Sequence, residues 1–149
     1  MKIKRVIIVL SILIVLLMLT GGVCFYNRYT HTFSEVVKSN WNIELPENYH
    51  EIYKTNDGIS FNGDGIRYHV LQYDNLEAIK EMVNWQSTDV VRIDSKVKML
   101  LKNLDIPSEY EINWQDEYKY YYKAQEDLSI VYFILVEDLG RVYIIENFQ

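Results

Sequence analysis

Residues 129–136 read Ser-Ile-Val-Tyr-Phe-Ile-Leu-Val, and this run decides the class of fold. Successive side chains of a β-strand point to opposite faces of its sheet. Because every residue from 130 to 136 is apolar or aromatic, a strand built from this run is apolar on both faces. A strand of this kind belongs in the middle of a sheet. We therefore expect a central strand here.

Two further strand-like runs flank this stretch, at 118–123 and 141–148. The connections are short and polar, at 125–127 and 137–140, which is typical of an antiparallel meander. Earlier in the chain, 52–55, 59–61 and 66–73 are strand candidates separated by Asn, Asp and Gly turn residues. In the last of these runs, alternation places Tyr68 and Val70 on one face and Leu71 on the other.

Three helices are expected between and before the strands. Thr32 and Glu35 have capping-box spacing and predict a short helix through about Asn40. Asp74 is the expected N-cap of a second helix that carries Ile79 on its apolar side. A third helix is predicted from Thr88 or Asp89, with an apolar stripe at Val90, Ile93, Val97, Leu100, Leu101 and Leu104. The order of elements predicts an α+β domain with helices packed on one face of an antiparallel sheet.

The N-terminal segment has a different character. Residues 6–25 form a nearly continuous apolar run, whose helix of roughly 30 Å would span the hydrocarbon core of a bilayer. Basic residues precede the run at positions 2, 4 and 5, which favours a cytoplasmic N-terminus and an extracytoplasmic C-terminal domain in the cell membrane. We expect a signal-anchor at 1–27, a short helical connector at 28–45 and the α+β domain at 46–149.

Other interpretations of this segment stay open. Residues 6–19 also suit the apolar part of a cleaved signal peptide, with Thr20 and Gly22 as small residues before the cut. A lipoprotein would be modified at Cys24, but Val23 stands where a small residue is required. The reverse topology would leave the domain in the cytosol. Few alanines and abundant Ile, Lys, Asn and Tyr indicate an AT-rich genome, such as that of a low-GC bacterium.

The charge of the chain excludes some partners. Residues 29–149 contain 11 Lys and Arg against 21 Asp and Glu, a net charge of −10. Such a domain repels the phosphate backbone, so nucleic acid is not an expected partner. Cys24 is the only cysteine, so the chain forms no internal disulfide and the domain is stabilised by packing alone.

No catalytic or cofactor motif is present in the sequence. Zinc-binding His-Glu-x-x-His, cysteine pairs, a P-loop, a dinucleotide-binding glycine pattern and a nucleophile elbow are all missing. We therefore expect neither an enzyme nor a bound metal or cofactor. The alternatives are a small envelope hydrolase or processing factor, and an accessory subunit whose helix packs through Ser11, Gly21 and Gly22.

Candidate partner-binding residues come from the acidic turns and the tyrosine-rich run. They are Asn62, Asp64, Tyr121, Glu137 and Asp138. Acidic turns would steer a cationic partner toward the domain, and an exposed tyrosine would supply contact area. The sequence thus predicts a membrane-anchored, non-enzymatic module of a bacterial envelope that binds a basic protein or peptide.

Overall fold

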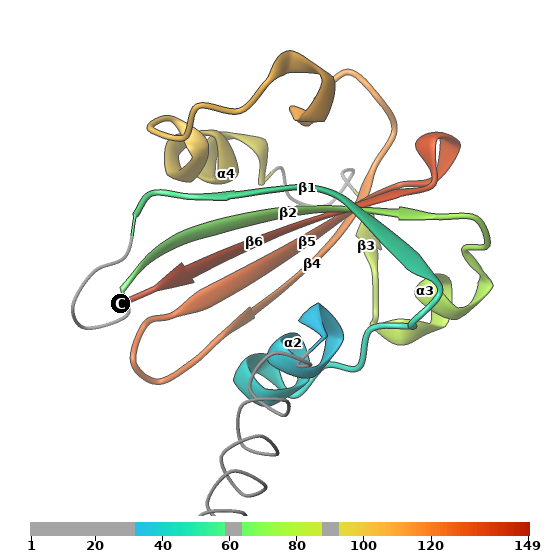
Figure 1. Cartoon of the computed structure of the whole chain (residues 1–149), viewed down its shortest axis with the longest axis horizontal. Coiled ribbons are helices and arrows are strands. Elements are labelled where there is room, and N and C mark those ends of the chain that lie inside the picture. Colours follow the sequence, from blue (N-terminus) through green and yellow to red (C-terminus); the bar gives the residue numbers. More distant parts are fainter. Residues whose placement is uncertain (1–31, 59–63, 88–92) are drawn as a thin grey trace, which may run out of the picture.

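The computed structural model describes residues 32–58, 64–87 and 93–149. Within them, six strands form one antiparallel sheet in the order β1-β2-β6-β5-β4-β3 (Figure 1). The strands are β1 (Tyr49–Asn56), β2 (Gly65–Tyr73), β3 (Gln86–Ser87), β4 (Lys119–Ala124), β5 (Ile130–Val136) and β6 (Arg141–Phe148). The helices are α2 (Phe33–Trp41), α3 (Glu77–Met82) and α4 (Asp94–Leu101), with short 3₁₀ turns η1 (Ser108–Tyr110) and η2 (Glu137–Leu139). The described part of the chain is thus an α+β domain.

The predicted meander of the last three strands is confirmed, and β5 lies inside the sheet between β4 and β6. The first hairpin, β1 and β2, joins the meander through pairing of β2 with β6. Gly140 at the β5–β6 turn adopts φ +62°, and a Cβ there would meet the Tyr73 carbonyl oxygen at 2.7 Å. Glycine is therefore required at the point where this turn approaches the end of β2.

Helices cover both faces of the sheet, so the prediction that they pack on one face is wrong (Figure 1). Helices α2 and α3 lie on the face formed by Leu71, Phe133 and Ile144. Helix α4 and the segment after it lie on the opposite face, over side chains such as Tyr120 and Ile134. The physical reason lies in β5 itself, because a strand that is apolar on both faces requires a packed layer on each.

Helix α2 begins as predicted. The Thr32 hydroxyl accepts the backbone N–H of Glu35, and the Glu35 carboxylate accepts the backbone N–H of Thr32. The helix then buries Val37 and Trp41 in the core. At its end, the Trp41 indole N–H donates to Oε1 of the fully buried Glu146 at 2.5 Å, which fastens the helix to β6.

The other helices differ from expectation at their ends. The N-cap of α3 is Leu76 rather than Asp74, because the Asn75 side chain instead accepts the first free backbone N–H, that of Glu77. Helix α4 begins at Asp94, and the predicted start at 88 or 89 lies outside the described residues. The predicted membrane span at 6–25 lies outside them too. No helix in 32–58, 64–87 or 93–149 is long and apolar enough to cross a bilayer.

Candidate functional site

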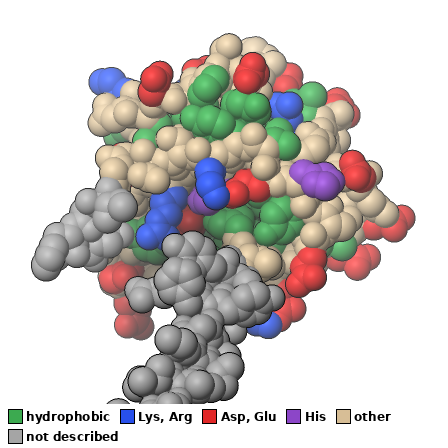
Figure 2. Space-filling view, in the orientation of Figure 1, with side chains coloured by type: hydrophobic (Ala, Val, Ile, Leu, Met, Phe, Trp, Pro, Cys, Tyr) green, Lys and Arg blue, Asp and Glu red, His purple; other side chains and the backbone are tan. Residues whose placement is uncertain are grey.

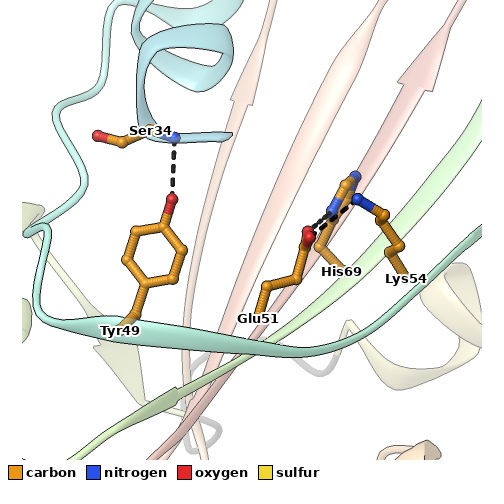
Figure 3. Close-up of polar contacts among 5 residues, drawn as sticks. All are labelled: Ser34, Tyr49, Glu51, Lys54 and His69. Carbon is orange, nitrogen blue, oxygen red and sulfur yellow. Dashed lines mark hydrogen bonds and ion pairs between the residues drawn. The ribbon is translucent and has the colours of Figure 1, made fainter. Parts of the chain in front are cut away.

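A polar network joins the edge strand β1 to its neighbours (Figure 3). Glu51 lies between His69, whose Nδ1 is 2.6 Å from Oε1, and Lys54, whose Nζ is 3.1 Å from Oε2. Hydrogen bonding to His69 lowers the pKa of Glu51, and Lys54 adds to this effect against the opposing desolvation. The His69 ring stacks on Phe33 with centroids 3.8 Å apart. This half-buried pair therefore links β1, β2 and α2.

The Glu51–His69 pair stands apart from the hollows beside β4 and α4. Neither Glu51 nor His69 lines the hollows beside β4 or α4. The described ranges contain no group of three His, Cys, Asp or Glu side chains that could hold a metal ion. The stacking of His69 on Phe33 and its contact with Glu51 assign the pair to the packing of α2 and β1 on the sheet.

A wider hollow lies on the α2–α3 face, beside strand β4. It has a volume of about 660 Å³. We call it the β4 groove. Its lining residues are Asn42, Ile43, Glu44 and Pro46 after α2, Ala78, Glu81, Met82, Val83 and Asn84 in and after α3, and Tyr121 and Lys123 on β4. A volume of this size falls within the range of sites that bind ligands.

One wall of the β4 groove is held in place by hydrogen bonds from β4 and its turn to the end of α2. The Lys123 ammonium donates to the Trp41 carbonyl oxygen at 2.7 Å, and the Gln125 amide donates to the Asn40 carbonyl oxygen at 2.5 Å. The last carbonyl groups of a helix lack intrahelical partners, so these donors satisfy them. Asn42 then takes the left-handed conformation, with φ 52°, and turns the chain along the groove.

The other wall is fixed by Glu137, which lies in η2. Its two carboxylate oxygens are each 2.6 Å from a lysine, Lys119 on β4 and Lys80 on α3. Hydrogen bonds from Lys119 and Lys80 lower the pKa of Glu137. The Trp85 indole N–H also donates to the Ile79 carbonyl oxygen at 2.8 Å and ties the end of α3 to the following segment. Helix α3 therefore has a defined position beside β4.

The groove offers an aromatic ring and negative charge to a ligand. The half-buried Tyr121 ring packs on Phe133 at a centroid distance of 6.2 Å, and its hydroxyl has no hydrogen bond to another described residue. Glu81 is exposed and forms no ion pair within the described ranges, whereas Glu44 pairs with Lys38 at 2.5 Å. Figure 2 shows that acidic side chains surround much of the domain in that view.

The five residues predicted from sequence do not form one cluster. Tyr121 lines the β4 groove, and Asn62 lies outside the described residues. Glu137 and Asp138 border a smaller hollow of about 160 Å³ together with Glu117. Asp64 is exposed at the opposite end of the sheet, because β2 begins where β6 ends. Asp64 is therefore separated from Glu137 and Asp138 by roughly 24 Å, the length of strand β6.

Sequence reasoning misses most of the groove. Glu81 follows the predicted N-cap Asp74 as an ordinary helix residue, and Ile43 lies in the predicted connector at 28–45. No local pattern identifies either as a groove residue, because the lining segments lie far apart in the chain. Only the tyrosine-rich run at 118–122 indicates a groove residue. Strand alternation places Tyr121 on the face opposite to that of Tyr118, Tyr120 and Tyr122.

No family model matches the chain, and comparison with curated proteins and with solved structures finds no match either. The fold and the groove define a small acidic α+β domain with a hollow beside an outer strand of its sheet. The function must therefore be argued from this geometry alone.

Proposed function

We propose that the protein is a membrane-anchored, non-enzymatic module that binds a basic peptide or a basic segment of another protein outside the cell membrane. The observation that carries this proposal is the β4 groove, which combines a usable volume, the Tyr121 ring and the carboxylate of Glu81. Tyrosine supplies a large, rigid contact area with a polar end, which suits recognition.

The charge of the domain supports a cationic ligand. Residues 29–149 have a net charge of −10, and a field of this sign raises the rate at which a basic partner meets the surface. Lys119 is paired with Glu137. Lys123 keeps its positive charge while it donates to the Trp41 carbonyl oxygen, so the groove lining, which also contains Glu44 and Glu81, has a net charge of −1.

The membrane part of the proposal rests on the apolar run at 6–25 and the basic residues before it. We expect the full chain to stay in the membrane pellet after a carbonate wash, and protease added to spheroplasts to digest residues 32–149. Extraction by carbonate, or a domain that resists the added protease while a known external protein is cut, would refute this location.

Binding can be tested with the full chain in a non-ionic detergent and two short fluorescent peptides, one alternating Lys and Val and one alternating Glu and Val. We expect the Lys peptide to bind and the Glu peptide not to bind. Affinity for the Lys peptide should fall between about 0.01 and 0.3 M salt, because the Debye length shortens over this range.

Two variants localise the binding. Glu81→Gln and Tyr121→Ala should each weaken binding of the Lys peptide several-fold, the first mainly through association and the second mainly through dissociation. Asp64→Asn removes the same charge beside β2, which β6 and β5 separate from β4, and serves as the matched control. Equal binding of both peptides, or equal effects of the Glu81 and Asp64 variants, would reject the groove as the site.

A further inference from the structure

Strand β4 has a partner along only part of its outer edge. Strand β3 pairs only with Lys119 and Tyr120, and on the Tyr121 side the chain enters this strand at Gln86. From Tyr121 to Ala124, no strand in the described ranges pairs with β4 on the side away from β5. We call this stretch the free edge of β4.

The hydrogen bond at the following turn shows which backbone groups the free edge presents. The Gln125 N–H donates to the Ser129 carbonyl oxygen at 2.9 Å, so residue 125 faces β5. In an antiparallel ladder the direction of the backbone groups alternates from residue to residue. Residues 119, 121 and 123 therefore bond to β5, whereas Tyr120, Tyr122 and Ala124 face outward. Tyr120 is opposite Gln86 of β3, which leaves the N–H and C=O groups of Tyr122 and Ala124 at the free edge.

This edge lacks three of the common protections against pairing. Outer strands are commonly guarded by proline, by a bulge or by lysines that project past the edge. Strand β4 contains no proline, and its pairing with β5 runs without a register shift. Both of its lysines are drawn inward, Lys119 to Glu137 and Lys123 to the Trp41 carbonyl oxygen.

The surroundings of the free edge fit an extended basic segment. The β4 groove and Tyr121 lie on one face of the edge. The half-exposed Tyr122, paired with Tyr132 at a centroid distance of 6.1 Å, lies on the other. Exposed acids that form no ion pair within the described ranges stand before the strand, after it and in the groove; they are Glu117, Glu126, Asp127 and Glu81.

We propose that the ligand binds as an added strand on the free edge of β4, in line with β3, through backbone hydrogen bonds to Tyr122 and Ala124. This inference rests on the proposed function and specifies its mode. The occupant is an extended, basic segment of another protein, whose alternate side chains fall toward the β4 groove and toward Tyr122. A second copy of the chain would bring two domains of charge −10 together, so charge disfavours it.

The test uses the full chain in detergent and the alternating Lys and Val peptide, with backbone N-methyl groups placed on all Lys or on all Val residues. An added strand bonds through every second residue. One methylated peptide should therefore lose at least about tenfold in affinity, while the other should bind within about twofold of the unmethylated peptide. Equal effects of the two methylation patterns would overturn strand addition.

A matched pair of protein variants gives a second test. Ala124→Pro removes an outward N–H and leaves the β4–β5 ladder intact, because proline is tolerated where the N–H of an edge strand faces outward. Ala124→Val keeps the N–H. We expect the proline variant to bind the peptide roughly tenfold more weakly than the valine variant, and equal affinities would overturn the proposal. If the circular dichroism signal shows that the proline variant is unfolded, the N-methyl peptide test on the unmutated chain alone decides between strand addition and its rejection.

The outcomes separate the two proposals. Failure of the parent chain to bind the Lys peptide rejects the proposed function itself. Binding that ignores both methylation patterns rejects only strand addition. Sedimentation that shows a dimer whose formation is blocked by Ala124→Pro would place a second copy on the free edge and overturn the assignment to a basic segment.

Discussion

Replacing Trp41 by Phe should destabilise the domain strongly, because it removes the described hydrogen-bond donor of a buried carboxylate. Trp41 is 1% exposed and Glu146 is 0% exposed, and the indole N–H lies 2.5 Å from Oε1. The other oxygen, Oε2, has no hydrogen-bond partner in the described ranges. The Arg67 side chain stacks on Phe148 instead, with Cζ 4.5 Å from the ring centroid, although Arg67 and Glu146 are cross-strand neighbours.

The expected magnitude has two parts. A hydrogen bond to a charged group contributes about 1.5 to 3 kcal/mol, and the smaller phenyl ring leaves a cavity that costs roughly 1 kcal/mol more. Trp41→Phe should therefore cost about 2.5 to 4 kcal/mol. Glu146→Gln keeps an oxygen acceptor for the indole and should cost less than about 2 kcal/mol. In a chain that already carries Glu146→Gln, loss of the indole leaves a neutral amide, so Trp41→Phe should cost about 1 to 2 kcal/mol less there.

The assay is urea unfolding of the segment 32–149, followed by far-ultraviolet circular dichroism, for both single variants and the double variant. Trp85→Phe is the matched control, because its indole N–H donates to a neutral carbonyl, that of Ile79, at 2.8 Å. Its cost should be the same with or without the Glu146→Gln change. If Trp41→Phe costs less than about 1 kcal/mol, or costs the same in both backgrounds, the role assigned to this hydrogen bond is wrong.

Two further predictions concern stability. Val97→Asp in α4 should unfold the segment 32–149, at a cost on the order of several kcal/mol, because Val97 is fully buried. Lys96→Asp, on the exposed side of the same helix, should leave the segment folded. Equal unfolding midpoints for the two variants would contradict the helix orientation. Glu137→Gln should cost about 1 kcal/mol at pH 7, where Lys119 and Lys80 contribute two partly exposed ion pairs. Because the folded pKa of Glu137 lies below 4.5, this contribution is present above pH 4.5 and is lost as the pH falls through the folded value. The difference between parent and variant should vanish at lower pH, and a difference that persists there would exclude the ionic origin.

Local sequence signals are sufficient for several elements. The spacing of Thr32 and Glu35 predicts the start of α2, and the structure confirms the reciprocal hydrogen bonds. Alternation in 66–73 places Tyr68 and Leu71 on opposite faces correctly, because the side-chain period of a strand is a property of the backbone alone. The turns that follow β4 and β5 are likewise visible as short polar stretches.

Longer-range features could not be predicted from such signals. The pairing of β2 with β6 joins residues about 75 positions apart, and no turn between them fixes the register. Glu146 follows an apolar run and alternates like a residue of the buried face, yet only the tertiary structure shows that the Trp41 indole donates a hydrogen bond to its side chain there. The two-sided cover of the sheet depends on where α4 packs.

An acidic α+β domain behind an apolar N-terminal run could be predicted from the sequence, because composition, charge and side-chain period are properties of short stretches of chain. Tertiary structure alone decided the candidate site. The β4 groove is formed by segments near residues 43, 82 and 121, which come together only when α2 and α3 pack on the same face of the sheet. The free edge of β4 exists because β3 begins only at Gln86, opposite Tyr120, and the directions of the Lys119 and Lys123 side chains leave that edge open.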